Sequence, residues 1–454
     1  MYMRDLLTLD AAPFAGNAHR PAGPATAAEV IIAVFALLDA ARLRWCLVHG
    51  HEGLPHRHGS DIDIVVGPGV TARHLHDLLH NAEGETGARV VRARGGFITL
   101  GWTTPEGLPQ FLSFDFSADY MFGNLLIRSG TALLDGRRRH GDFWRPATAT
   151  EFACRLGRAI LKGKLDAGTQ KTLTQLFRDD QAGAKSALRP MWTRERAAEL
   201  ASAAETGQWN AVAVKAAKLR RDLQLRLLLR GPGRFASTWL GTQAARFARL
   251  VRPKGLNVVM LGPDGAGKSS TIAALEVALA PLFARSEVRG FAPTLKQLLR
   301  RSPSATGTPH ALKPRSLPLS LLRAGWWTAY GLFSHVSLYW ARVGSTLVLN
   351  DRHFVDILVD PVCYRYGGPR WLLALVWQAM PRPDLVILLH GPAEILQARK
   401  RELTVDETAR QCRDYLRLVM PMRDAHVVDA TQPFARVVRT VADIVVAELA
   451  ARDR

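Results

Sequence analysis

The sequence has 454 residues, of which 48% are hydrophobic and 22% charged. This length predicts two or three domains, and this composition excludes a mainly disordered chain. The 60 Lys and Arg residues outnumber the 40 Asp and Glu residues, which gives a net charge of +20. Residues 151–350 carry 31 basic and 11 acidic side chains and so account for the whole excess. Such a region is typical of contact with nucleic acid, an anionic membrane or polyphosphate substrates, although a biased base composition of the gene gives the same pattern.

The cysteines and the apolar segments indicate the compartment. The four cysteines are widely spaced and form no CxxC pair, so neither a disulfide framework nor a zinc site is expected. We expect no signal peptide and a cytoplasmic location, with peripheral membrane contact left open. The most apolar long segment is Leu317–Trp340, but Arg323 and His335 interrupt it. These polar residues favour a buried or interfacial helix over a membrane span.

The first part of the chain predicts an α+β domain followed by helices. Residues 1–25 are rich in Pro, Ala and Gly and are expected to be loosely ordered, and the domain is predicted to cover residues 26–190. Apolar runs bounded by Gly, Pro and polar residues predict strands, and apolar stripes predict helices. The expected strands are Trp45–Val48, Asp61–Val66, Phe97–Trp102 and Gln110–Ser117, and the expected helices are 28–43, Phe152–Lys162 and Gln170–Asp179.

A basic helical connector is predicted at residues 191–254. Helices are expected at Arg194–Ala204, Trp209–Leu229 and Thr242–Val251, with Gly231-Pro232-Gly233 ending the second. The second helix fits either a basic amphipathic helix on an anionic membrane or nucleic acid, or a solvated helix between two domains. It lacks the interleaved aromatic residues that stack on bases, so nucleic acid is the weaker alternative.

Residues 255–454 predict a parallel sheet with crossover helices. Apolar runs at 256–261, 346–349, 384–389 and 426–428 alternate with longer helical segments. The first run leads into a glycine-rich loop that fits GxxxxGK[ST] between a strand and a helix, a pattern that cradles phosphates with backbone N–H groups. The residues expected to bind ATP are Gly262, Asp264, Gly265, Ala266, Gly267, Lys268, Ser269 and Ser270. Lys268 is expected to bridge the β- and γ-phosphates, and the Ser269 hydroxyl to bind Mg²⁺.

This part of the chain resembles the thymidylate kinase family of P-loop kinases. That family has a DGxGK loop followed by two hydroxyl residues, a later Asp-Arg-aromatic motif, a Pro-Asp-Leu strand start and a basic lid. The corresponding segments are Asp264–Ser270, Asp351-Arg352-His353, Pro383-Asp384-Leu385 and Arg399-Lys400-Arg401, and the last strand corresponds to His426–Asp429. The resemblance implies ATP-dependent phosphoryl transfer to a phosphorylated acceptor.

The resemblance also implies roles for individual residues. Arg352 would hold the acceptor phosphate, Asp264 or Asp351 would orient the acceptor, and Arg399 and Arg401 would close over the transferring group. The alternative for the two lid arginines is a solvated basic helix face. The chain departs from the family in its basic segment 289–342, which favours a bulkier or more anionic acceptor than thymidylate. His390 stands where some members have an acid, so no second Mg²⁺ ligand is named.

Three carboxylates of the first domain form a second candidate site. Asp61 and Asp63 are alternate residues of one strand and therefore share a face, and Asp115 lies on a later strand. Three such carboxylates suit Mg²⁺ and a nucleoside triphosphate. The pattern resembles the nucleotidyltransferase superfamily, in which a Gly-Ser turn precedes Asp-x-Asp. Here His51 follows Gly50 in place of the serine, and solvent-facing strand residues are the alternative interpretation.

Three functional hypotheses follow from these patterns. The preferred one is a thymidylate kinase-like phosphotransferase with an appended nucleotidyltransferase-like domain, using ATP and Mg²⁺. The second assigns the main chemistry to the first domain. The third is an adaptor at a membrane or nucleic acid that is switched by ATP. The sequence leaves open whether the chain forms a homodimer.

Overall fold

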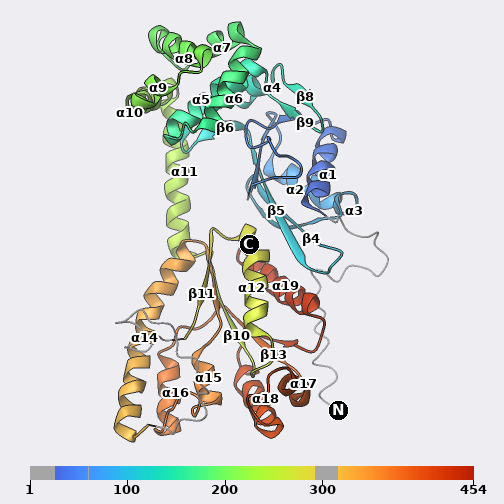
Figure 1. Ribbon diagram of the computed structural model, residues 1–454, viewed down its shortest axis with the longest axis vertical. Helices are drawn as coiled ribbons and strands as arrows, with labels where there is room; N and C mark the ends of the chain where they lie inside the picture. Colours follow the sequence, from blue (N-terminus) through green and yellow to red (C-terminus); the bar gives the residue numbers. More distant parts are fainter. Residues whose placement is uncertain (1–25, 60, 292–314, 454) are drawn as a thin grey trace. The chain divides into compact units, whose positions relative to one another are not determined.

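The computed structural model describes residues 26–59, 61–291 and 315–453. The predicted loose segment 1–25 lies outside the described residues, as does part of the basic segment 289–342. Residue contacts divide the chain into two compact units, mainly residues 26–247 and 248–453, called here the N-terminal and C-terminal units. Each combines a five-stranded sheet with helices (Figure 1). The mixed α/β class predicted from the sequence is confirmed.

The sheet of the N-terminal unit has the strand order β1-β2-β5-β4-β3. Its neighbours β2 and β5 run parallel, and their register sets Asp63 opposite Asp115. Helix α1 (Ala27–Ala40) begins at Thr26, whose side chain accepts a hydrogen bond from the Glu29 N–H, and it buries one apolar side against this sheet. The strands are β1 (Trp45–Cys46), β2 (Asp61–Val66), β3 (Arg89–Arg94), β4 (Phe97–Thr103) and β5 (Pro109–Ser117), and the further helices are α2 (Ala72–Asn81) and α3 (Glu83–Thr86).

Short elements that the sequence did not predict connect this sheet to the helices. They form two small antiparallel ribbons and one helical turn, and they are too short and polar for a clear periodicity. The ribbons and the turn are β6 (Asp119–Phe122), β7 (Leu125–Ser129), α4 (Gly130–Leu134), β8 (Arg138–His140) and β9 (Phe143–Arg145).

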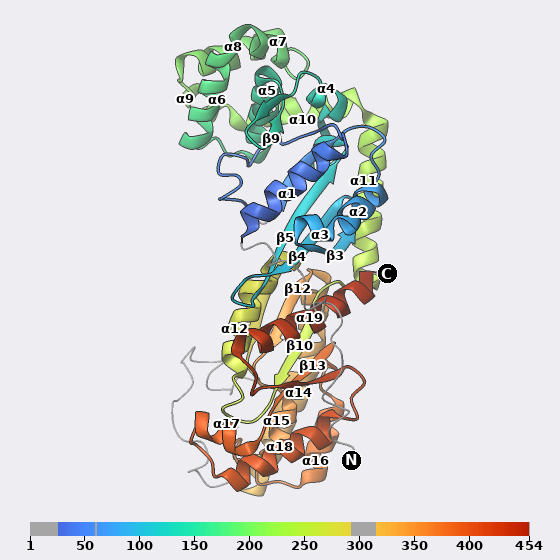
Figure 2. The ribbon, with the colours of Figure 1, turned by 90° about the vertical axis from the view of Figure 1, so that its right-hand side faces the viewer.

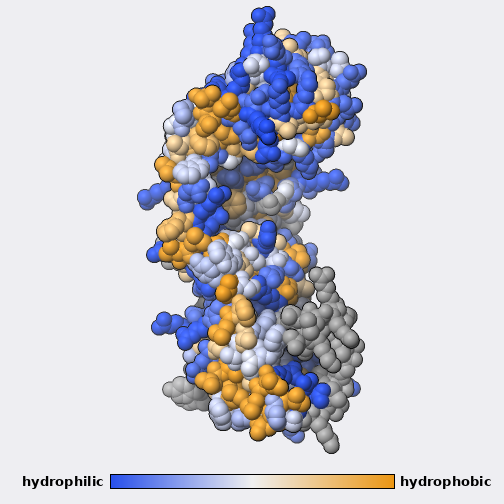
Figure 3. Space-filling model, turned by 90° about the vertical axis from the view of Figure 1, so that its left-hand side faces the viewer, coloured by the Kyte–Doolittle hydropathy of each residue, from blue (hydrophilic) through white to orange (hydrophobic). Residues whose placement is uncertain are grey.

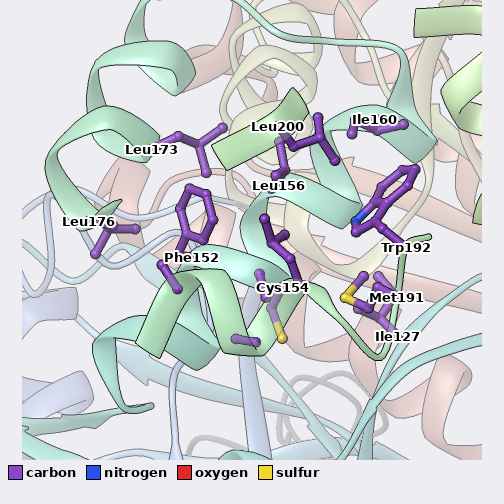
Figure 4. Close-up of a cluster of buried hydrophobic side chains, with 14 of the residues drawn as sticks. Ile127, Phe152, Cys154, Leu156, Ile160, Leu173, Leu176, Met191, Trp192 and Leu200 are labelled. Carbon is purple, nitrogen blue, oxygen red and sulfur yellow. The ribbon is translucent and has the colours of Figure 1, made fainter. Parts of the chain in front are cut away.

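The helices after residue 147 share one hydrophobic core. Figure 4 shows Phe152 and Leu156 with Leu173 and Leu200, which come from three different helices of this cluster. Leu219 and Leu223 of the predicted connector are also fully buried in it, so this part of the connector is built into the N-terminal unit. The helices are α5 (Thr148–Lys162), α6 (Ala167–Asp179), α7 (Gln181–Leu188), α8 (Arg194–Thr206), α9 (Asn210–Val214) and α10 (Ala216–Arg230).

Two helix boundaries in the connector differ from the prediction. The segment Trp209–Leu229 is not one helix, because it is interrupted at Lys215 between α9 and α10. The predicted helix Thr242–Val251 begins ten residues earlier, as α11 (Pro232–Val251). Pro232 is the first residue of α11. Proline is tolerated there because the first helical turn needs no N–H donor.

The sheet of the C-terminal unit is parallel throughout, with the strand order β11-β12-β10-β13-β14. The central strand β10 is buried along its whole length, which explains why all its residues except Asn257 are apolar. The carboxyl ends of parallel strands lie at one edge, and there the loops after β10, β12 and β13 meet. The strands are β10 (Leu256–Leu261), β11 (Arg285–Arg289), β12 (Thr346–Asn350), β13 (Leu385–His390) and β14 (Ala425–Asp429). The predicted parallel sheet is therefore confirmed.

Helices cover both faces of this sheet (Figures 1 and 2). Helix α12 packs against α19, while α15 and α18 pack together over Val259 and Leu261 on the other face. The helices are α12 (Lys268–Leu279), the 3₁₀ turn η1 (Ala280–Leu282), α14 (Leu317–Val343), α15 (Phe354–Val359), α16 (Arg370–Gln378), α17 (Ala393–Arg399), α18 (Val405–Val419) and α19 (Phe434–Asp453). None of the helices in the described residues is long and apolar enough to cross a membrane, in agreement with the prediction for Leu317–Trp340.

Candidate active site

The loop between β10 and α12 has a positive φ at its three glycines, a backbone that favours glycine. Gly262 and Gly265 have φ angles of 144° and 83°, which side chains disfavour. A Cβ atom on Gly265 would lie 2.1 Å from the Leu396 carbonyl oxygen. The glycines of the motif therefore let the loop pass close to α17 and turn directly into the start of α12.

Lys268 is the first residue of α12 and its side chain folds back over the loop. Its Nζ donates hydrogen bonds to the carbonyl oxygens of Gly262 (2.5 Å) and Pro263 (3.1 Å). Burial lowers the pKa of Lys268, while the carboxylates of Asp356, Asp264 and Asp351 oppose this shift. The start of a helix also presents backbone N–H groups that have no partner within the helix. The loop thus combines an ammonium group and a helix start, as a site for an anion requires.

Ser269 and Asp351 meet across the edge of the sheet. The Ser269 hydroxyl lies 3.2 Å from both carboxylate oxygens of Asp351. Asp351 directly follows β12, and β12 is the parallel neighbour of β10, so the topology itself brings these two residues together. Both groups offer oxygen atoms, which are the ligands that Mg²⁺ prefers.

A cavity of about 360 Å³ joins this loop to the residues after β12 and to the end of α17. The expected nucleotide-binding residues line it, except Ala266, which is buried beneath the loop. Arg352 and Arg399 also line it, as does Lys400 of the same basic segment. Side chains that the sequence did not single out complete the wall, and they are Asp356, Asp360, Cys363, Tyr364, Gln411 and Tyr415.

The three basic residues at the end of α17 differ in their contacts and exposure. Lys400 Nζ lies 3.5 Å from an Asp264 carboxylate oxygen. Burial of Asp264 opposes ionisation, but the charges of Lys268 and Lys400 outweigh it and hold the pKa of Asp264 below its ordinary value. Arg399 donates a hydrogen bond to the Ala430 carbonyl (2.8 Å) at the cavity. Arg401 is exposed and is not part of the cavity wall, so its predicted place over the transferring group differs from its position here.

Asp356 is a buried carboxylate in this cavity that the sequence did not reveal. It accepts hydrogen bonds from the Tyr415 hydroxyl (2.7 Å) and from the His353 N–H (2.7 Å). Burial raises its pKa, and the nearby Lys268 opposes that rise. Asp356 and Lys268 are distant in sequence, so no local pattern could have linked them.

The three carboxylates of the N-terminal unit face the same side of their sheet. Asp63 and Asp115 are directly opposed on β2 and β5, and Asp61 is one alternation earlier on β2. Burial, together with the charges of Asp61 and Asp115, raises the pKa of Asp63 to about 6. Burial and Asp61 also raise the pKa of Asp115. The predicted grouping of these residues on one face is thus present.

His49 lies beside this carboxylate group. Its Nε2 is 3.4 Å from an Asp63 oxygen. Burial and the charges of Arg158 and Arg155 lower the pKa of His49 to about 3, so the ring is neutral at pH 7. It lines a cavity of about 460 Å³ whose charged wall is mainly basic, through Arg155, Arg158, Lys162 and Lys164, with Glu52 and Asp166 as the acidic members.

His51, which replaces the serine of the resembled pattern, is buried and structural. Its Nε2 lies 3.1 Å from Glu151 Oε1, and Arg155 Nη2 lies 2.8 Å from the same ring nitrogen. Arg145 also donates hydrogen bonds to the buried Glu151. The segment after Gly50 is therefore held by this network.

The two candidate sites differ in how they suit a metal ion. Within the ranges that the structure describes, no three His, Cys, Asp or Glu side chains are placed to hold one ion. A Mg²⁺ ion needs only one or two protein oxygens when phosphates and water complete its shell. Ser269 and Asp351 supply such a pair, so these residues fit Mg²⁺. The carboxylates on β2 and β5 have suitable chemistry but do not form a three-ligand site.

Comparisons with known proteins identify no family for this chain. No protein-family model matches the chain, and no curated protein matches it either.

Proposed function

We propose that the C-terminal unit is a P-loop kinase, similar to thymidylate kinases, that transfers a phosphoryl group from ATP to a phosphorylated acceptor. The observation that carries this proposal is the Ser269–Asp351 contact at the mouth of the cavity formed by the 262–269 loop. A hydroxyl and a carboxylate at this place, beside a lysine and a helix start, are the groups that phosphoryl transfer requires.

The donor triphosphate would lie along the glycine-rich loop. The backbone N–H groups of the loop would hold the phosphate oxygens. Lys268 would also bind these oxygens, in exchange for its present hydrogen bonds to the Gly262 and Pro263 carbonyls. A Mg²⁺ ion held by Ser269 and Asp351 would neutralise charge on the β- and γ-phosphates. The chain's own contribution is positioning and positive charge, since a loose transition state needs little covalent assistance.

The acceptor would occupy the part of the cavity between Arg352 and α18. Arg352 projects there from the segment after β12, and its planar guanidinium suits a phosphate. Arg399 would exchange its bond to the Ala430 carbonyl for the transferring group. Lys400 is better placed than Arg401 to act beside it, because only Lys400 lines the cavity.

A screen for acceptor-dependent ADP release tests this function. Nucleoside monophosphates, sugar phosphates and polyprenyl phosphates would be offered with ATP and Mg²⁺, and phosphorylated product would be identified by mass spectrometry. We expect one acceptor class to be phosphorylated, and Lys268→Ala to abolish the reaction. Arg352→Ala is expected to raise KM for the acceptor while leaving ATP binding intact. A chain that binds ATP but phosphorylates none of these acceptors would contradict the proposed acceptor class, and a chain that binds no ATP would contradict the kinase itself.

A second candidate function belongs to the N-terminal unit. The Asp63–Asp115 register, with His49 and a mainly basic cavity beside it, favours nucleotidyl transfer. Pyrophosphate release that is lost in Asp61→Asn/Asp63→Asn and retained in Lys268→Ala would support it. Pyrophosphate release that depends on Lys268 instead would exclude this assignment.

A further inference from the structure

Helix α14 exposes a continuous apolar stripe to solvent. Leu322, Phe333, Val336 and Trp340 are 59–77% exposed, although they are large apolar residues. With Trp326 and Ala329 between them they follow intervals of four and three residues, so they lie on one side of the helix. In Figure 3, which faces the side where α14 lies in Figure 1, apolar residues gather over the lower part of the surface.

The opposite side of α14 is packed into the C-terminal unit. Ala324, Trp327 and Leu338 are buried there, and Trp327 packs on Phe354. The polar residue His335 lies away from the apolar stripe and contacts the Ala379 carbonyl (3.2 Å). Arg342 likewise pairs with Asp384 (3.0 Å). The helix is therefore apolar on both sides, and a large exposed apolar stripe of this kind marks an interaction surface.

The charges around the stripe are basic. No Asp or Glu occurs between residues 296 and 350. Arg315 precedes α14, and the exposed Arg370 begins the neighbouring helix α16. Arg323 is half-buried, with its guanidinium over the ring of the buried Trp327. Burial and the nearby guanidinium groups of Arg315 and Arg365 lower the pKa of Arg323.

We propose that the outer face of α14 binds an anionic lipid surface, with the apolar stripe among the acyl chains and the arginines at the headgroups. Helices with arginine beside a face of Trp, Phe and Leu lie in such interfaces, and Trp and Tyr rings prefer the boundary between lipid and water. The exposed Tyr339 and Trp340 at the end of the helix fit this boundary. This surface is independent of the proposed phosphoryl transfer.

A second copy of the chain is the competing occupant. The alternating spacing of four and three also suits packing of two helices. However, a second α14 helix offers no carboxylate from this segment to pair with the arginines around the stripe. An anionic membrane supplies the opposite charge, so the charge pattern favours lipid.

Flotation of the full chain with vesicles tests the proposal. The vesicles would contain phosphatidylcholine alone or phosphatidylcholine with phosphatidylglycerol, at low and at high salt. We expect flotation with the anionic vesicles that weakens as salt rises. Phe333→Asp/Trp340→Asp is expected to reduce bound protein about tenfold. Val277→Asp is the matched control, because Val277 on α12 is 77% exposed, as Phe333 is, and lies outside the stripe.

Several outcomes would overturn the proposal. These are absence of flotation at low salt, equal flotation with uncharged vesicles, and flotation that survives Phe333→Asp/Trp340→Asp. Light scattering after gel filtration detects the competing occupant. A dimer that the same double substitution converts to a monomer, without lipid binding, would assign the stripe to a second copy. Circular dichroism of each variant would verify that the exposed substitutions leave the fold intact.

Discussion

The hydroxyl of Ser269 and the carboxylate of Asp351 lie 3.2 Å apart, although 82 residues separate them in the sequence. The pair arises from topology, since Ser269 lies in the first turn of α12 after β10 and Asp351 directly follows the parallel neighbour β12. If these residues share one Mg²⁺ ion, they act as a unit, and their substitutions must be strongly coupled.

A double-mutant cycle measures this coupling. We expect Ser269→Ala and Asp351→Asn each to lower kcat roughly 100-fold, and the double variant to lose little more, because either change removes the same ion. The measurement is ADP release over a Mg²⁺ titration. Effects that simply multiply in the double variant would show that the two residues do not share an ion.

Lys268 is expected to support catalysis through its charge more than it supports the fold. Lys268→Ala should lower kcat roughly 100- to 1,000-fold, because the developing charge on the phosphate oxygens loses its ammonium partner. The fold should persist, since the hydrogen bonds of Lys268 go to loop carbonyls, but loss of its charge beside Asp356 and Asp264 should lower the melting temperature. Lys218→Ala in the N-terminal unit is a control for general loss of positive charge, and equal losses in both variants would speak against a specific role.

The lid residues offer a test of the structure against the sequence pattern. Lys400→Ala should lower kcat about tenfold, because Lys400 holds Asp264 at the cavity. Arg401→Ala should leave the rate near that of the unaltered chain, since Arg401 is exposed outside the cavity wall. A lower kcat in Arg401→Ala than in Lys400→Ala would instead support the placement of Arg401 over the transferring group.

The raised pKa of Asp63 predicts that the stability of the folded chain depends on pH. Its pKa is raised to about 6 by burial and by Asp61 and Asp115, so the folded chain holds a proton at Asp63 that the unfolded chain has released. Between about pH 4 and pH 6 the contribution of Asp63 to stability therefore falls as pH rises. Asp63→Asn removes this penalty and should stabilise the chain by about 1 kcal/mol at neutral pH, a discounted value because the side chain is partly exposed.

The measurement is chemical denaturation of both proteins across this pH range. The gain from Asp63→Asn should shrink towards zero as pH falls to about 4, where the carboxyl is protonated in both states. Asp142→Asn, on an exposed side chain, is the control. A gain that is independent of pH would mean that Asp63 is not perturbed by its neighbours.

Sequence reasoning located the parts of the sites that depend on local pattern. The 262–269 loop, the Asp351-Arg352 pair and the alternation of Asp61 and Asp63 each lie within a few residues and carry recognisable spacing. The parallel sheet was also predictable, because its buried strands are mainly apolar runs. These features need no knowledge of contacts between distant residues.

The remaining features depend on contacts between distant residues. The place of Asp356 in the site depends on Tyr415 and Lys268, which are distant in the sequence and which the fold brings close to it. The choice between Lys400 and Arg401 depends on where α17 ends, which three consecutive basic residues do not reveal. The buried position of His51 depends on Glu151, which lies 100 residues away in the sequence.

Calorimetric titration of the full chain with ATP in the presence of Mg²⁺ tests the central claim most directly. The account predicts binding to the unaltered chain and to Asp61→Asn/Asp63→Asn, with weaker binding in Lys268→Ala and when Mg²⁺ is removed. Binding that survives Lys268→Ala but is lost in Asp61→Asn/Asp63→Asn would contradict it, because the nucleotide would then occupy the N-terminal unit.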